Sequence, residues 1–227
     1  MEMLKAEFVL SKQNKANNIF HFDSKQILYM ILAFFIGRAN ILDKLTPFGI
    51  ALITAYIILG KLNIFVLVST ILGIFTFHGL KGADYYFAII MIFFILNRSN
   101  KLRNLSIIES SIVASILFLL AKLVYLFIFK EIFIYDLFII IFEGIVVFAL
   151  TYIFCYSFSV ESVGKRRSSE SLICGIITLS LMLSGIQSIS IAGISFKTVL
   201  SVLIILYLGF SEGAFVGGVA GISLGLI

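Results

Sequence analysis

The stretch FFIGRANILDKLTPFG, residues 34–49, decides how the rest of this chain is understood. It places Arg38 inside an apolar run, continues with Asp43-Lys44, and reaches Pro47, the only proline, where a second apolar run begins. Proline lacks an amide hydrogen and has a fixed φ, so it fits best in the first turn of a helix. The stretch therefore predicts a tight turn between two helices. Both flanking runs lack a polar face, which favours a hairpin in lipid.

The composition of the 227-residue chain indicates the same environment. It is 61% hydrophobic and 13% charged, with a mean hydropathy of +1.14, whereas a soluble domain carries roughly 25% charged residues. Its apolar runs, roughly 15 to 27 residues long, lack the alternation of barrel strands. We predict an all-α polytopic membrane protein with about nine transmembrane helices, in a range of about eight to ten, arranged as antiparallel hairpins.

Two regions follow from this pattern: a basic cytoplasmic tail over residues 1–26 and a multi-pass domain over residues 27–227. The predicted spans are 27–42, 46–60, 64–80, 85–96, 105–129, 132–158, 172–186, 196–210 and 212–227. The chain stops within apolar sequence, which predicts a fragment of a longer protein.

The orientation follows from the basic residues, which tend to stay on the cytoplasmic side. With the amino terminus inside, eleven Lys and Arg residues near span ends are cytoplasmic and four are outside. The 97–104 and 159–171 loops are then cytoplasmic. The net charge of +5 is therefore a topology signal that needs no nucleic-acid partner, and the predicted location is the plasma membrane.

Charge within a membrane span is costly, so the ionisable residues there are candidates for a function. Four are singled out: Arg38, Lys122, Asp136 and Glu143. Arg38 either snorkels to the outer interface or forms an ion pair. In a hairpin about Lys130-Glu131, Lys122 lies within roughly 4–6 Å in depth of both Asp136 and Glu143. These three residues form either a buried pair that holds the hairpin in register or a relay for protons or cations.

Glycine recurs every fourth residue near the end of the chain, at Gly209, Gly213, Gly217, Gly221 and Gly225. On one helix these positions form a slowly drifting ridge without side chains, which lets another helix approach closely. The partner is either a helix of the same chain or a second copy.

Nothing in the sequence points to an active site. The chain has no phosphate-binding glycine loop, zinc spacing, nucleophile elbow or catalytic triad. Cys155 and Cys174 lie in apolar runs and are interpreted as packing residues. We therefore expect no catalytic, metal-binding or cofactor-binding residue in this chain.

Four groups of residues form a recognisable pattern: Gly37-Arg38-Ala39, Ile41-Leu42, Pro47-Phe48-Gly49 and the glycine-rich Ser211–Ile227. The first three groups resemble the start of the membrane region of the stage II sporulation protein E family, and the fourth is similar to a later membrane helix of that family. The resemblance spans most of the chain from Phe34 onward; Glu170-Ser171 and residues 185–196 are compatible with it.

The resemblance implies about ten membrane helices, a cytoplasmic linker and a PP2C-class serine phosphatase domain that depends on manganese or magnesium. That enzyme dephosphorylates an anti-anti-sigma factor and so activates the forespore sigma factor. The protein gathers at the asymmetric septum with the tubulin-like division protein. This chain ends before the linker and phosphatase, so no catalytic or metal-binding residue is carried over.

Two functional hypotheses result. The first is a membrane-anchoring and assembly module of a sporulation phosphatase, with the lipid bilayer, septal division proteins and a second copy as partners. The alternative is a small-solute transporter, or its substrate-binding membrane subunit, with Lys122, Asp136 and Glu143 as its site.

Overall fold

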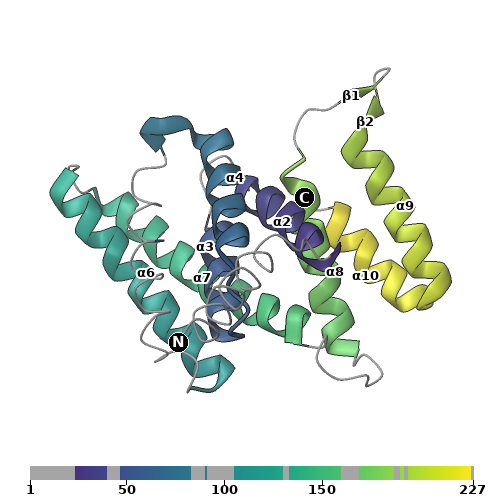
Figure 1. Ribbon diagram of the computed structural model, residues 1–227, viewed down its shortest axis with the longest axis horizontal. Coiled ribbons are helices and arrows are strands. Elements are labelled where there is room, and N and C mark those ends of the chain that lie inside the picture. Colours follow the sequence, from purple (N-terminus) through teal and green to yellow (C-terminus); the bar gives the residue numbers. More distant parts are fainter. Residues whose placement is uncertain are drawn as a thin grey trace, which may run out of the picture.

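The computed structural model describes residues 24–39, 47–82, 90, 105–129, 133–159, 169–186, 190–191 and 194–225. Within these ranges the chain forms eight helices and one short antiparallel strand pair (Figure 1). The helices are α2 (Ser24–Arg38), α3 (Phe48–Ile58), α4 (Ile64–Gly82), α6 (Ile107–Phe129), α7 (Ile134–Ser159), α8 (Ser169–Ser184), α9 (Phe196–Ser211) and α10 (Ala214–Gly225), and the strands are β1 (Ser190–Ile191) and β2 (Ile194–Ser195). The all-α prediction is confirmed.

Eight of the nine predicted spans coincide with one of these helices, and the 85–96 span lies almost wholly outside the described residues. In the described part of the chain, α6 and α7 are the two helices long and apolar enough to cross a membrane. The other apolar helices are 10–17 residues long. In α4 the apolar stretch is shortened because Gly79 has a non-helical φ of 65°. The number of spans therefore stays a prediction.

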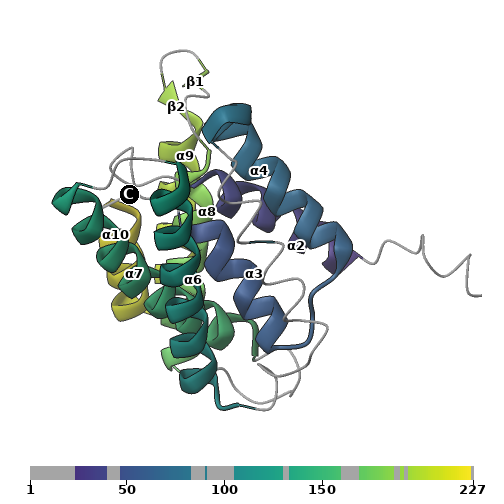
Figure 2. The same ribbon diagram turned by 90° about the vertical axis from the view of Figure 1, so that its left-hand side faces the viewer.

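Helix α3 lies at the centre of the bundle, and every residue from Phe48 to Ile57 is buried. Figure 2 shows α3 with α6 on one side and α2 and α4 on the other. At its carboxyl end, Tyr56 stacks on Phe158 of α7 at 5.1 Å between ring centroids. The ring of Tyr29 from α2 packs edge-on against both. This aromatic cluster joins three helices that are distant in the sequence.

The direction of neighbouring helices can be followed from their contacts. Cys155 of α7 lies against Ala55 of α3, and Phe158 lies against Lys61 beyond the end of α3, so α3 and α7 run in the same direction. In contrast, α6 and α7 are antiparallel, because residues earlier in α6 meet residues later in α7. The chain therefore reverses direction between α6 and α7, as the predicted hairpin requires.

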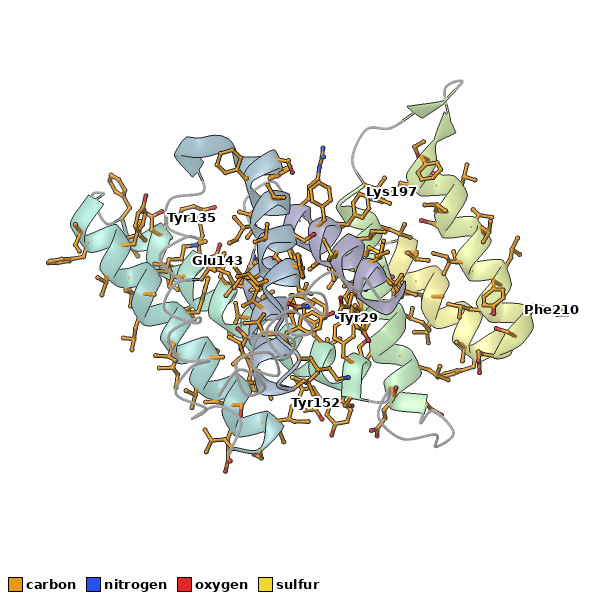
Figure 3. All side chains as sticks on the ribbon, viewed as in Figure 1. Tyr29, Tyr135, Glu143, Tyr152, Lys197 and Phe210 are labelled. Carbon is orange, nitrogen blue, oxygen red and sulfur yellow. The ribbon has the colours of Figure 1, made fainter. Side chains whose placement is uncertain are left out.

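The outer surface of the bundle is apolar. On α6 the exposed large hydrophobic residues recur every four positions, which is one face of a helix; they are Ile108, Ile112, Ile116, Leu120 and Val124. Helix α9 has no buried residue at all. Phe210, at the outer edge of the α9–α10 hairpin, is 95% exposed (Figure 3). Exposed apolar faces of this extent are typical of surfaces that contact lipid or another protein.

The start of α6 is set by a reciprocal pair of hydrogen bonds. The Ser106 amide donates to Oε2 of Glu109 at 3.0 Å, and the Glu109 amide donates to Oγ of Ser106 at 3.3 Å. This capping box satisfies two amides that the first helical turn leaves unpaired. It therefore places the predicted cytoplasmic end of α6 at Ser106.

Candidate functional site

The charged centre of the bundle is an ion pair between Lys122 of α6 and Glu143 of α7. The Lys122 ammonium donates to Oε2 of Glu143, and their side chains are 12% and 2% exposed. The same ammonium lies 6.0 Å from the centroid of the Phe118 ring. Figure 3 shows Glu143 inside the bundle, away from its outer edge. The structure thus brings together two of the residues that the hairpin pattern placed at similar depth.

Close packing holds this pair in place. A Cβ on Gly144, next to Glu143, would lie 2.6 Å from Cδ2 of Leu119, so a larger residue there would require the Leu119 side chain to move. Phe118 and Val147 belong to an apolar cluster with Ile50 of α3. Two charges in such surroundings stabilise each other only as a pair, because removing one leaves the other buried alone. The pair can therefore fix the register of α6 against α7.

Asp136 has a different role from the one that the hairpin pattern suggested. Its Oδ2 accepts a hydrogen bond from the Phe133 amide at 3.2 Å, at the start of α7. A carboxylate there satisfies an unpaired amide and faces the positive end of the helix dipole. The predicted set of three residues is thus a buried pair and a separate helix cap.

Arg38 is the last residue of α2, and its Nε is buried without a hydrogen-bond partner among the described residues. Residues 40–46, which contain most of the predicted turn, lie outside the described residues. Pro47 precedes α3 as its N-cap, with φ −77°. Pro47 thus lies directly before the first helical residue of α3, at the end of the predicted turn. The Pro47 carbonyl already accepts the first helical hydrogen bond, from Ala51 at 3.1 Å.

Small residues create close helix crossings around α2. A Cβ on Gly37 would lie 2.5 Å from the Thr70 carbonyl oxygen of α4, and one on Gly73 would collide with the Phe34 carbonyl. One turn before Phe34 and Gly73 on the same two helices, the Ser69 hydroxyl donates to the Met30 carbonyl at 2.6 Å. The sequence analysis missed Ser69 and Gly73. Their spacing of four residues in an apolar run is the small-residue signal that identifies such a crossing.

The same geometry recurs where α8 ends. A Cβ on Gly185 would collide with the Phe35 carbonyl of α2, so α8 also approaches α2 backbone to backbone. On the neighbouring α3, a Cβ on Gly49 would lie 3.0 Å from the Thr70 and Ile74 side chains. Three glycines of the segments that resemble the sporulation family are thus contact points between helices: Gly37, Gly49 and Gly185.

The predicted glycine ridge on one helix was wrong. Helix α9 ends at Ser211, and Gly213 has φ +95°, a conformation that side chains disfavour, so the chain reverses there. Gly209 of α9 then faces Gly217 of α10, whereas a Cβ on Gly221 or Gly225 would meet no atom within 4 Å. The four-residue spacing crosses a turn and does not continue along one face. Self-association through these glycines stays a prediction.

The cysteines are free and separated in the structure. Cys155 is buried with its Sγ 4.0 Å from the Ala55 carbonyl oxygen, and Cys174 is half-buried. Among the described residues, no group of three His, Cys, Asp or Glu side chains is placed to hold a metal ion.

Comparison with known proteins covers nearly all of the chain. Residues 2–227 match the family described as SpoIIE, N-terminal domain. Stage II sporulation protein E of Bacillus subtilis (strain 168) is 26% identical over 213 residues, which are 89% of this chain and 25% of that relative. The chain therefore spans about a quarter of the length of the curated relative that it matches. No solved structure matches it.

Proposed function

Because the chain belongs to the SpoIIE N-terminal domain family, we propose that it is the membrane-anchoring and assembly module of a sporulation serine phosphatase. The family match occupies residues 2–227 and leaves no room for a phosphatase domain within this chain. Catalysis, with manganese or magnesium, belongs in this proposal to a phosphatase domain outside residues 2–227, as the family resemblance implies.

The observation that carries the proposal is the distribution of apolar and charged side chains. Exposed leucine, isoleucine, valine and phenylalanine side chains cover α6, α7 and α9, while Glu143 and Lys122 are enclosed. In water this arrangement is costly, whereas in a bilayer the apolar faces need no cover and an enclosed ion pair avoids lipid. The module is proposed to lie in the plasma membrane as a multi-pass bundle.

The orientation with the amino terminus in the cytoplasm rests on the basic residues of the predicted loops. The helix directions agree with the number of predicted spans between α3 and α7, because an even number of chain reversals makes the two helices parallel, as their contacts are. By family resemblance the partners are septal and division proteins, and the location during sporulation is the asymmetric septum.

Two measurements test the proposal. A fluorescent fusion of residues 1–227, expressed in a sporulating cell, is expected in the membrane fraction after alkaline extraction and at the asymmetric septum. Recovery of the unfused chain as a water-soluble monomer without detergent would refute membrane anchoring. A uniform distribution around the cell, with membrane extraction unchanged, would refute the septal role alone.

The rival hypothesis of a solute transporter requires a cavity at the charged residues. Among the described residues, two clefts of about 230 and 460 Å³ are lined by side chains other than Lys122 and Glu143. The direct contact between the Lys122 ammonium and the Glu143 carboxylate supports a structural pair. Uptake of a solute or of protons into vesicles that contain the purified chain, abolished by Glu143→Gln, would favour the transporter.

A further inference from the structure

A cleft of about 230 Å³ lies where α7 ends and α8 begins. Phe158 and Ser157 form one wall, Ser171 and Gly175 another, and Leu208 of α9 lies across from them. Its lining also includes Leu32 of α2. The cleft thus lies between the central bundle and the α9–α10 hairpin, which Figure 1 shows at the side of the bundle.

The walls suit a hydrocarbon tail. They are mostly apolar, and the Thr178 hydroxyl in the lining already donates to the Cys174 carbonyl at 2.8 Å. A dry apolar cavity of about 150 Å³ is large enough for benzene. A cleft of about 230 Å³ therefore takes part of one acyl chain, whereas a helix about 10 Å wide does not fit.

Positive charge lies at the same end of the bundle. Lys61 is exposed, and its ammonium donates to the carbonyl of Phe158 at 3.0 Å, so it lies beside a residue that lines the cleft. Basic groups at the cytoplasmic end of membrane helices attract anionic lipid headgroups.

We propose that the α7–α8 cleft binds one acyl chain of an anionic phospholipid whose headgroup contacts Lys61. The proposal rests on the membrane placement proposed above. The occupant is a lipid with a net negative charge because the cleft supplies an apolar slot and its rim supplies a cation. A bound lipid would fill the space between α8 and α9 and so join the hairpin to the bundle.

Gly175 offers a direct way to fill the cleft without disturbing a helix contact. A Cβ there would meet only Oγ of Ser157, at 4.0 Å, which is ordinary contact distance. Gly175→Leu is therefore expected to place its side chain in the lipid's space. Gly218→Leu is the matched control, because a Cβ on Gly218 meets no atom within 4 Å and Gly218 does not line the cleft.

The test uses the whole chain, reconstituted in vesicles of equal parts phosphatidylglycerol and phosphatidylcholine and released for native mass spectrometry. The wild type and Gly218→Leu are expected to retain one phosphatidylglycerol, and Gly175→Leu is expected to retain no more than the phosphatidylcholine background. Lys61→Gln keeps a hydrogen-bond donor and loses the charge. It should reduce the preference for phosphatidylglycerol about fivefold, the factor that corresponds to about 1 kcal/mol for one cation at a membrane surface.

Equal retention of phosphatidylglycerol by the wild type and a folded Gly175→Leu would overturn the proposal. So would an unchanged lipid preference in Lys61→Gln, which remains informative if Gly175→Leu does not fold. If Gly175→Leu changed the binding of another protein but retained as much phosphatidylglycerol as the wild type, the proposal would also be overturned. Each of these results leaves membrane anchoring intact, whereas a chain that dissolves without detergent refutes the anchoring itself.

Discussion

Gly209 of α9 and Gly217 of α10 meet backbone to backbone: a Cβ on Gly217 would lie 2.7 Å from the Gly209 Cα and 3.2 Å from its amide nitrogen. No side chain separates the two helices at this point. Lipid supplies no hydrophobic drive for helix association, so close van der Waals packing of this kind is what holds a hairpin together in a membrane.

Gly217→Leu should open this hairpin. Its Cβ would collide with the backbone of Gly209, which cannot rotate away as a side chain can. We expect a loss of about 1–3 kcal/mol in unfolding free energy, as for other overpacked sites, measured by thermal or chemical unfolding in detergent. Gly221→Leu on the same helix is the control, because a Cβ there meets no atom within 4 Å. Equal losses in the two variants would contradict the crossing.

Gly37→Ala should weaken the packing of α2 on α4. The added methyl would lie 2.5 Å from the Thr70 carbonyl oxygen, so one helix must move. The expected cost is about 1–3 kcal/mol, read from the unfolding midpoint. Gly175→Ala adds the same methyl at 4.0 Å from its nearest neighbour and is expected to be well tolerated. The crossing is disproved if Gly37→Ala unfolds at the wild-type midpoint.

The Lys122–Glu143 pair predicts a strong coupling between two substitutions. Lys122→Met and Glu143→Leu should each cost about 3–5 kcal/mol, because each leaves a buried charge without its partner. The double variant replaces both charges with apolar side chains of similar size and should recover most of that loss. A double-mutant cycle in detergent measures the coupling. Simple addition of the two single losses would show that the ion pair does not hold α6 against α7.

Single-cysteine labelling tests the orientation. In a Cys174→Ser background, where the remaining Cys155 is buried, Asn100→Cys should react with a membrane-impermeant reagent only after the cells are opened. Lys44→Cys, in the predicted outer turn between the first two spans, should react in intact cells. These outcomes follow from the excess of basic residues on one side of the predicted spans. Labelling of Asn100→Cys from outside would reverse the whole topology.

The capping box predicts a smaller effect at the start of α6. Ser106→Ala removes the oxygen that accepts the Glu109 amide, and loss of such a cap costs about 0.5–2 kcal/mol. Hydrogen exchange of the first turn of α6 should rise in this variant, whereas Ser106→Asp, which restores an acceptor, should behave as the wild type. Unchanged exchange in Ser106→Ala would show that the cap does not stabilise the turn.

Local sequence determined the all-α class of the protein and the positions of the helices that the structure describes. An apolar run that ends at a short charged or glycine-containing segment predicts a helix without any knowledge of tertiary contacts. Eight of the nine predicted spans therefore coincide with a helix. That Lys122 lies at the depth of a carboxylate on the next helix was also predicted from the sequence, but only the structure decided for Glu143 over Asp136. A hairpin fixes the relative depth of residues on its two helices, and only two charged groups at one depth can satisfy each other.

Only the tertiary structure decided which small residues matter and where the cleft lies. Gly209 and Gly217 form a contact because Gly213 reverses the chain, and the repeat by itself gives no sign of that turn. Gly73 and Gly185 are contact points because the backbone carbonyls of Phe34 and Phe35 lie where a Cβ would be. A glycine carries no side chain whose chemistry names its partner, so its role depends on which backbone lies opposite, and that is a property of the assembled bundle.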